Sequence, residues 1–153
     1  MKAKKFNIRV YGILKNVNGK FLLTHELRGG VRMTKFVGGG LEFNEGLKEA
    51  LKREFEEEMN LKIEVESLVY INDFLQISKF NSNDQLMSVY YEVTTSDWGR
   101  VNECIQNPTK EQSFLWVDAS TYNVEDVTFP IDKVVFEMLK TSVRYKDSLE
   151  KVK

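Results

Sequence analysis

The chain has 153 residues, of which 42% are hydrophobic and 29% are charged, and its formal net charge is -1. These values fit one compact domain with a hydrophobic core, and the near-neutral charge argues against a nucleic-acid polymer or an anionic membrane as the partner. Cys104 is the only cysteine, the first residues do not resemble a signal peptide, and no apolar run approaches the roughly 20 residues that a bilayer requires, so we expect a cytoplasmic protein without a disulfide.

The first part of the chain predicts two strands and a glycine-rich stretch. Apolar and polar residues alternate over 5–15, which indicates a strand. The Asn-Gly dipeptide at 18–19 favours a tight turn into a second strand over 20–26. An irregular stretch then follows, from Gly29 to the glycine triplet at 38–40.

The middle of the chain predicts a helix followed by further strands. The helix is expected over 45–59, with Asn44 as its N-cap and Asn60 in the left-handed conformation that ends it. Strand-like segments follow at 62–70, 73–79 and 86–95, and a turn at 81–84 separates the last two.

The last part of the chain predicts a loop, a strand and a second helix. A polar loop is expected over 96–112, followed by a short strand over 113–117. Pro130 suits the first turn of a helix over 131–143, because the N–H that proline lacks is not used there. With no internal repeat and no linker, the prediction is one mixed α/β domain over 1–153.

The helix predicted over 45–59 carries acidic residues on its inner side. At about 100° per residue, Glu54, Glu57 and Glu58 share the sector of Leu47 and Ala50. On composition alone, a solvated acidic face would be the better explanation. However, an unpaired buried carboxylate costs several kcal/mol, so acidic residues on the apolar side require a partner.

A hard divalent cation is a partner that explains this pattern. Glu54, Glu57 and Glu58 are spaced to present their oxygens to one point, and oxygen ligands are those that Mg²⁺ and Mn²⁺ prefer. A carbonyl of the glycine triplet at 38–40 could join them, because glycines let the backbone approach a ligand closely. Arg53 can hold Glu57 through an i,i+4 pair or reach back toward the start of the helix.

The segment from Gly39 to Leu61 resembles the Nudix box. That box reads G, five residues, E, seven residues, then R-E-U-x-E-E-x-G-U, where U is a bulky aliphatic or aromatic residue. Gly39, Glu45 and the run that begins at Arg53 match every fixed position except Asn60, where the family has glycine. Asparagine tolerates the same backbone geometry. Outside the box, the order of elements is similar over most of the chain.

The resemblance implies a Nudix-like α/β/α sandwich around a mixed β-sheet. It also implies a Nudix-type pyrophosphohydrolase, which uses Mg²⁺ or Mn²⁺ to hydrolyse a nucleoside diphosphate linked to another group. The partner would be a small nucleotide-type substrate. Nucleoside triphosphates, ADP-ribose-like compounds, dinucleoside polyphosphates and sugar nucleotides all remain open, and a homodimer is plausible.

An alternative is a sensor module of the same fold that binds a nucleotide-linked metabolite without cleaving it. The intact pairs Arg53-Glu54 and Glu57-Glu58 favour the enzyme, because a sensor need not retain an acid that activates water. A third alternative, an acidic interaction scaffold, leaves the inward-facing carboxylates without a purpose.

Carried over to matching positions, the resemblance assigns roles to the residues of the box. Glu57 and Glu58 would be metal ligands, together with the Gly38 carbonyl, and Glu54 would be a metal ligand or the base that activates water. Arg53 would orient the glutamates.

By the same resemblance, Glu45 would support the cluster of Glu54, Glu57 and Glu58. Many family members take one further acid from a later loop, and Glu111 is the candidate here, with Glu103 behind it.

Three cations before the box are candidate contacts for substrate phosphates, where charge must be stabilised as the leaving group departs. They are Arg28, Arg32 and Lys35. Surface solubility explains them equally well. Among the aromatic residues, Trp116 is expected in the core, and Trp98 is expected to pack rather than to stack on a base.

Overall fold

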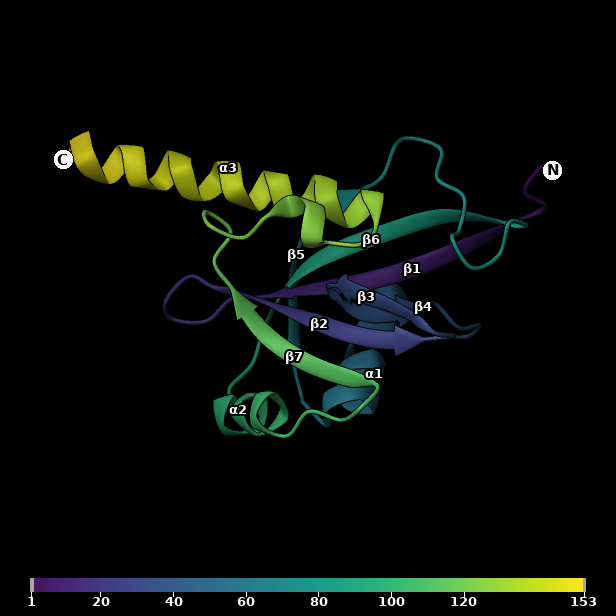
Figure 1. Cartoon of the computed structure of the whole chain (residues 1–153), viewed down its shortest axis with the longest axis horizontal. Helices are drawn as coiled ribbons and strands as arrows, with labels where there is room; N and C mark the ends of the chain where they lie inside the picture. Colours follow the sequence, from purple (N-terminus) through teal and green to yellow (C-terminus); the bar gives the residue numbers. More distant parts are fainter. Residues whose placement is uncertain (1, 153) are drawn as a thin grey trace.

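The computed structural model of the chain describes the backbone of residues 2–152 and the side chains of residues 2–142. Two β-sheets form the centre of the molecule. Helices α1 (Leu47–Met59) and α2 (Trp98–Gln106) lie on one side of the sheets, and α3 (Pro130–Val152) lies on the other (Figure 1). This arrangement confirms the expected α/β/α sandwich around a mixed sheet.

The first sheet has four strands and carries the glycine triplet. Its strands are β1 (Lys5–Leu14), β4 (Val37–Gly40), β5 (Glu64–Ile71) and β6 (Asp84–Thr94), in the order β4-β1-β6-β5. β1 runs parallel to β6 and antiparallel to β4. The triplet therefore lies on an edge strand, where Val10 pairs with Gly39 and Tyr11 pairs with Gly38.

The second sheet is antiparallel and has three strands. They are β2 (Phe21–Arg28), β3 (Val31–Lys35) and β7 (Gln112–Val117), in the order β3-β2-β7. Thr24 lies opposite Lys35, and Glu26 lies opposite Gln112. Because residues two apart on a strand share a face, this register places Glu26 and Lys35 on the same face of the sheet.

The turn predicted at 18–19 is present, but it joins strands of different sheets. The backbone N–H of Asn16 donates to the carbonyl of Lys20 at 2.9 Å, and Gly19 has a φ of 78°. After a single bridge between Lys15 and Phe21, β1 continues between β4 and β6, and β2 continues between β3 and β7. Both strands are thus paired on both sides with strands other than each other, so they do not form a hairpin.

The prediction of an irregular stretch from Gly29 to the glycine triplet is wrong. Most of it is occupied by β3 and the start of β4. Gly29 and Gly30 form the turn from β2 to β3, with φ values of 55° and 78°. Positive φ at both central residues is what a two-residue hairpin turn requires, so these glycines mark a hairpin rather than a loop.

The strand predicted over 73–79 is also wrong, apart from a single bridge between Ile77 and Gln85. The Asn72 side chain occupies this edge of β6 instead. Its Oδ1 accepts from the backbone N–H of Ser88 at 2.8 Å, and its Nδ2 donates to the carbonyl of Leu86 at 3.2 Å. The amide group therefore satisfies backbone groups that a paired strand would otherwise satisfy.

The loop predicted over 96–112 contains helix α2, which the sequence interpretation missed. The Asp97 side chain accepts from the backbone N–H of Arg100 at 3.1 Å and caps the helix. The Trp98 ring lies 6.2 Å from the Trp116 ring, measured between centroids. The preference for a packing role of Trp98 is confirmed.

Helix α1 begins two residues later than predicted and ends where predicted. Its N-cap is Gly46 rather than Asn44, and Asn44 has a φ of 69°, outside the helix. At the other end, Asn60 has a φ of 49° and its N–H donates to the Glu56 carbonyl at 2.9 Å. Asparagine thus fills the left-handed position where the family has glycine.

Helix α3 starts at Pro130, as expected, and extends past the predicted end to Val152. None of the helices in residues 2–152 combines the length and the apolar character that crossing a membrane requires.

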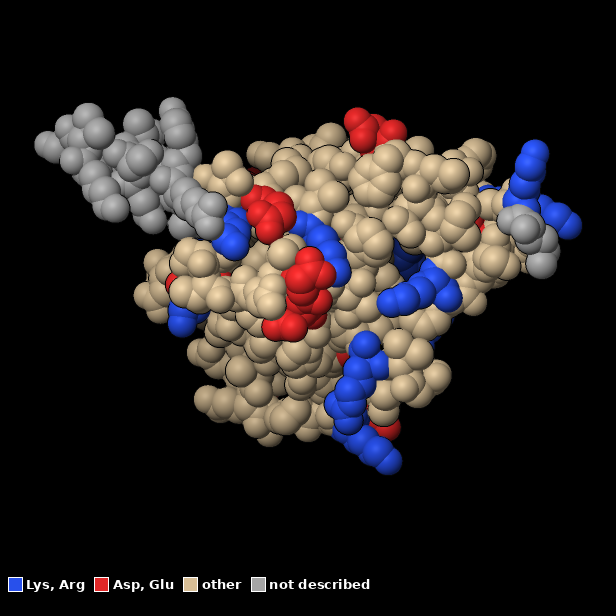
Figure 2. Space-filling model, turned by 45° about the horizontal axis from the view of Figure 1, so that its top comes forward, with Lys and Arg blue, Asp and Glu red and all other residues tan. Residues whose placement is uncertain are grey.

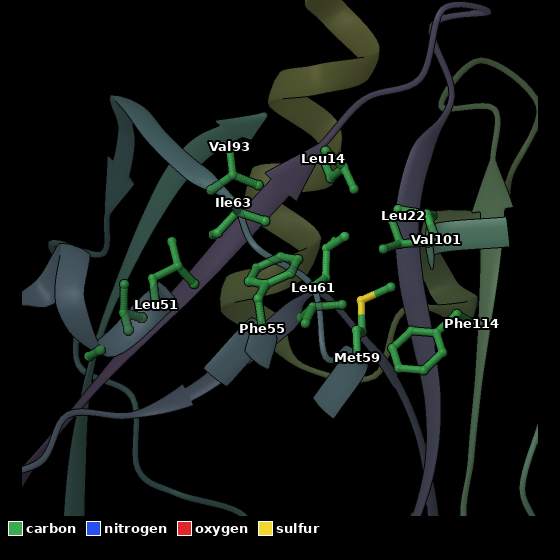
Figure 3. Close-up of a cluster of buried hydrophobic side chains, with 13 residues drawn as sticks. Leu14, Leu22, Leu51, Phe55, Met59, Leu61, Ile63, Val93, Val101 and Phe114 are labelled. Atoms are coloured by element: carbon green, nitrogen blue, oxygen red, sulfur yellow. The ribbon is translucent and has the colours of Figure 1, made fainter. Parts of the chain in front are cut away.

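The hydrophobic core has two parts, one against α1 and the other including Val135 and Phe136 of α3. Figure 3 shows the side chains of Phe55 and Met59 among residues from β1, β2, β6 and β7. Phe55 is completely buried and Met59 is 1% exposed. This packing fixes the rotation of α1 about its axis, and it thereby determines where the glutamates of the helix point.

Candidate active site

Arg53, in the middle of α1, holds the loop before the helix through Glu45. Its Nε and Nη2 atoms donate to the two carboxylate oxygens of Glu45 at 3.0 and 2.7 Å, which is the paired geometry that arginine forms with carboxylates. Glu45 also accepts from the backbone N–H of Glu42 at 2.9 Å. The hydrogen bonds between them raise the pKa of Arg53 and lower the pKa of Glu45, so both groups stay charged.

The Arg53 guanidinium also contacts two further glutamates and the backbone of β4. Nη1 donates to Glu54 Oε1 at 3.0 Å and to Glu57 Oε2 at 3.2 Å. Nη2 donates to the Gly40 carbonyl at 3.0 Å. Both contacts that the sequence allowed for this arginine, one with Glu57 and one with the start of the helix, are therefore present.

Glu54 lies between α1 and β4, and 15% of its side chain is exposed. A Cβ atom at Gly39 would come within 2.5 Å of Glu54 Oε1, so glycine at this position leaves the space that the carboxylate fills. Gly38 is required for another reason, because its φ of 154° and the adjacent Val10 carbonyl exclude a side chain. The inward orientation predicted for Glu54 is confirmed.

Glu58 also points toward the interior, one helical turn after Glu54. Its Oε2 atom is buried and has no hydrogen-bond partner among the described residues. Burial raises the pKa of Glu58 to about 8, while Lys35 acts in the opposite direction and Glu26 raises it further. The predicted orientation of Glu58 is confirmed, and one of its oxygens is available to a further partner.

Glu57 departs from the predicted inward orientation. Of its side chain, 57% is exposed, and the carboxylate lies at the rim, held by the i,i+4 contact with Arg53. The helical spacing predicted Glu57 in the sector of Leu47 and Ala50, but the contact with Arg53 holds its carboxylate outside that sector. Its assignment as a metal ligand stays a prediction.

Glu26 on β2 is an acidic neighbour that the sequence interpretation did not identify. It is close enough to Glu58 to raise the pKa of that carboxyl, and its Oε1 accepts from Gln112 Nε2 at 3.2 Å. The signal that could have found it is strand alternation, because Leu22 and Thr24 are buried on the same face of β2. We refer to Glu26, Glu54, Glu57 and Glu58 together as the acidic cluster.

Lys35 on β3 is 5% exposed, so its expected position in an irregular loop is wrong. Its Nζ donates to the carbonyls of Phe36 and Gly38 at 3.2 and 3.5 Å, and it lies 3.5 Å from Glu26 Oε1. Nζ is also 5.4 Å from the centroid of the Tyr11 ring. Burial alone would lower the pKa of Lys35, but Tyr11 and the nearby carboxylates outweigh it and raise the pKa. The ammonium therefore stays charged.

The other predicted site residues lie farther from these contacts. Glu111 is exposed just before β7, and no hydrogen bond or ion pair joins its carboxylate to the acidic cluster within the described residues. Arg28 is exposed and lies 4.8 Å from the centroid of the Phe80 ring. Arg32 is exposed on β3, opposite Leu27. The structure thus brings Lys35 to the cluster and leaves Arg32 and Glu111 at the surface.

A pocket of about 460 Å³ adjoins the acidic cluster, because Lys35 lines both. Its walls come from β1, β3, β6, the end of β2 at Arg28, the segment 76–81, and the first turn of α3 with the two residues before it. Asp132 of α3 lines the pocket and is 1% exposed; the Tyr90 hydroxyl donates to its Oδ1, while its Oδ2 has no partner among the described residues. Burial raises the pKa of Asp132 to about 6, although the hydrogen bond from Tyr90 lowers it.

The donors of the acidic cluster fit a hard divalent ion in their chemistry. They are oxygens of carboxylates, which is the ligand type of Mg²⁺ and Mn²⁺, and one of them, Glu58 Oε2, is buried without a partner. In the described part of the chain, no three acidic, histidine or cysteine side chains converge closely enough to hold a metal as they stand. Arg53 holds Glu57 at the rim, so the binding of an ion by Glu57 requires this side chain to turn.

The chain is similar in sequence and in fold to known proteins. The NUDIX domain family model matches residues 5–138. Among solved structures, the E. coli ORF135 protein is 20% identical with a TM-score of 0.68, and the alignment covers 92% of each chain. The MutT protein from Methanosarcina mazei Go1 is 18% identical with a TM-score of 0.65, covering 91% of this chain and 96% of that one.

A DNA mismatch repair protein MutT from methicillin-resistant Staphylococcus aureus 252 is 24% identical with a TM-score of 0.60, covering 91% of this chain and 98% of that one. No curated protein matches the chain. The structural likenesses show a shared fold, and the family match extends over most of the sequence and includes the acidic helix and the glycine triplet. The chain belongs to the Nudix hydrolase family.

Proposed function

We propose that the protein hydrolyses the pyrophosphate bond of a nucleoside diphosphate linked to another group and depends on Mg²⁺ or Mn²⁺. The observation that carries this proposal is the inward orientation of Glu54 and Glu58 on α1, with Glu58 Oε2 buried and unpartnered. Burying carboxylates beside one another costs stability. A site for a divalent cation explains why the helix nevertheless has them.

The metal would be held by Glu57, Glu58 and the Gly38 carbonyl, with Glu54 as a further ligand or as the base. A divalent ion there neutralises phosphate charge and lowers the pKa of a bound water. As the base, Glu54 accepts the proton of the attacking water. Arg53 keeps Glu54 in place through the hydrogen bond of 3.0 Å, and the packing of the helix keeps the arginine in place.

The pocket beside the cluster suits the nucleoside part of a small nucleotide-type substrate. Its volume of about 460 Å³ is in the range of small-molecule sites, about 300–1,000 Å³. Arg28 and Lys35 both line it, so a ligand seated there has cations close to its phosphates. The predicted contacts of Arg28 and Lys35 with substrate phosphates are therefore compatible with a ligand in this pocket. Arg32 is the weakest of the three candidates.

The distribution of surface charge supports a small ligand rather than a nucleic-acid polymer. On the face drawn in Figure 2, the coloured Lys and Arg side chains lie in separate groups, and several Asp and Glu side chains lie beside them. A polymer with a phosphate backbone is usually bound along a continuous basic stripe.

The test is a panel of nucleoside triphosphates, ADP-ribose-like compounds, dinucleoside polyphosphates and sugar nucleotides, assayed with Mg²⁺ and with Mn²⁺. Glu54→Gln and Glu57→Gln should each lower turnover of the best substrate by about 10² or more. Glu56→Gln is the matched control, because Glu56 is exposed on the same helix, and it should keep nearly the wild-type rate.

Wild-type rates in both Glu54→Gln and Glu57→Gln would reject the site assignment. Tight binding of a panel compound by calorimetry, with no turnover under any metal condition, would instead indicate the sensor module of the same fold.

A further inference from the structure

Lys35 is a cation enclosed by oxygen atoms at the edge of the acidic cluster. Its ammonium group lies 3.2 Å from the Phe36 carbonyl, 3.5 Å from the Gly38 carbonyl and 3.5 Å from Glu26 Oε1. At 5% exposure it is nearly closed off from water. Backbone carbonyls and carboxylates are also the groups that hold divalent ions in proteins, so this lysine lies in surroundings that a metal ion could use.

The position of Lys35 follows from strand register and not from the family box. β3 pairs with β2 so that Lys35 lies opposite Thr24, two residues from Glu26. The side chains of Lys35 and Glu26 therefore emerge on one face and reach the same space beside Glu58. Two acidic residues and one basic residue leave that space with a smaller negative charge than the carboxylates alone would give.

We propose that Lys35 is a resident cation, which takes one cation position between Glu26 and the Gly38 carbonyl and thereby weakens the binding of a divalent ion there. This inference rests on the proposed function, because it assumes that the acidic cluster binds divalent ions. An ion bound to the Gly38 carbonyl at about 2.1 Å would lie within about 6 Å of the ammonium. Two positive charges at that distance in a buried site repel strongly.

A purely structural role for Lys35 makes a different prediction. If the lysine only held β3 against β2, its replacement would change stability and would leave metal affinity unaltered. If it occupies a cation position, removal of its charge leaves Glu26 and the Gly38 carbonyl available to a metal. Metal affinity in the absence of substrate therefore separates the two roles.

The test is a titration of the full chain with Mn²⁺, in which free Mn²⁺ is measured by electron paramagnetic resonance without substrate. Lys35→Met, which keeps the length of the side chain and removes its charge, should tighten the weakest Mn²⁺ site about tenfold or more. Lys52→Met is the matched control, because Lys52 is exposed on α1 and lies 3.7 Å from Glu64. It removes the same charge from the protein and should change the affinity less than about twofold.

Circular dichroism shows whether Lys35→Met is folded. If Lys35→Met is not folded, Lys35→Gln is used instead, because it retains a donor for the Phe36 carbonyl. It should tighten the weakest Mn²⁺ site to the same extent. Affinity within about twofold of wild type in a folded neutral variant would overturn the inference.

That outcome differs from a failure of the proposed function, in which the wild-type chain would bind no Mn²⁺ and would turn over no compound of the panel.

Discussion

The interior around Phe55 of α1 is apolar, whereas the interior between β3 and the start of α3 contains charged groups beside its apolar side chains. Phe55 and Leu51 are completely buried among hydrocarbon side chains. Lys35 and Asp132 are almost as deeply buried, with 5% and 1% exposed. Burial of hydrocarbon stabilises the fold, but burial of a carboxylate or an ammonium group costs free energy unless partners compensate. The apolar interior thus explains folding, and the charged interior calls for a reason beyond stability.

Truncation of the apolar interior should give the largest effect. Phe55→Ala should lower the free energy of unfolding by about 3–5 kcal/mol, because it removes a completely buried ring and leaves a cavity. Urea denaturation followed by circular dichroism measures it. Phe43→Ala is the control, since Phe43 is 98% exposed, and it should change stability by less than about 0.5 kcal/mol. A loss below about 1 kcal/mol in Phe55→Ala would mean that the two interiors do not differ as described.

Stability in the charged interior should depend on pH through Asp132. Burial raises its pKa from the usual 3.8 to about 6, so between these values the folded state holds a proton that the unfolded state has lost. The carboxylate therefore destabilises the fold progressively as the pH rises from about 4 to about 6. The free energy of unfolding of Asp132→Asn minus that of wild type should therefore be larger at about pH 7.5 than at about pH 4, by up to about 3 kcal/mol.

Urea denaturation at the two pH values measures this difference. Asp126→Asn serves as the control, because Asp126 is exposed, and it should change stability by less than about 0.5 kcal/mol at either pH. A difference between Asp132→Asn and wild type that is equal at both pH values would contradict the assignment of a buried, proton-holding carboxyl.

A smaller effect is expected where the glycine triplet contacts the acidic cluster. Gly39→Ala should lower turnover about tenfold or more, because its Cβ atom would lie 2.5 Å from Glu54 Oε1 and displace the carboxylate. The neighbouring Gly40→Ala is the control, since its Cβ atom would make an ordinary contact of 3.6 Å with Arg9 Nη1. Steady-state kinetics with the best panel substrate measures the turnover of both variants. Equal rates in the two variants would mean that the position of Glu54 against β4 does not matter for turnover.

The smallest effect is expected at the C-terminal end of α1. Asn60→Gly should raise the free energy of unfolding by a few tenths of a kcal/mol, because glycine has no Cβ to oppose the φ of 49° at this position. Thermal unfolding measures the change, and turnover should stay at the wild-type level. Destabilisation by more than about 1 kcal/mol would show that the asparagine side chain has another partner.

Much of the candidate site could be predicted from one segment of sequence. Glu54 and Glu58 lie inward because helical periodicity places them in the sector of the apolar residues, and packing of Phe55 fixes that sector. The contacts of Arg53 with Glu45 and Glu57 are local as well. The spacing of residues along the chain thus predicts the part of the site that one helix and its preceding loop form.

Errors arose where a partner elsewhere in the chain decides the outcome. Asn72 takes the edge of β6 that a strand over 73–79 would have used, and only the fold brings that edge next to it. Glu57 is a local exception, because Arg53, four residues earlier on the same helix, holds it at the rim, which periodicity does not express. The segment at 31–35 is a strand because β2 is available to pair with it.

The family, the acidic helix, its left-handed end at Asn60 and the glycine triplet could all be predicted from the residues, because they depend on residues close together in the chain. The fold was needed to show that Glu26 and Lys35 join the acidic cluster and that Asp132 is buried beside the pocket. Register between β2 and β3 sets the first, and packing of α3 against the sheets sets the second. Contacts between distant segments depend on which surfaces pack against each other in the fold. The spacing of residues along the chain does not predict that packing.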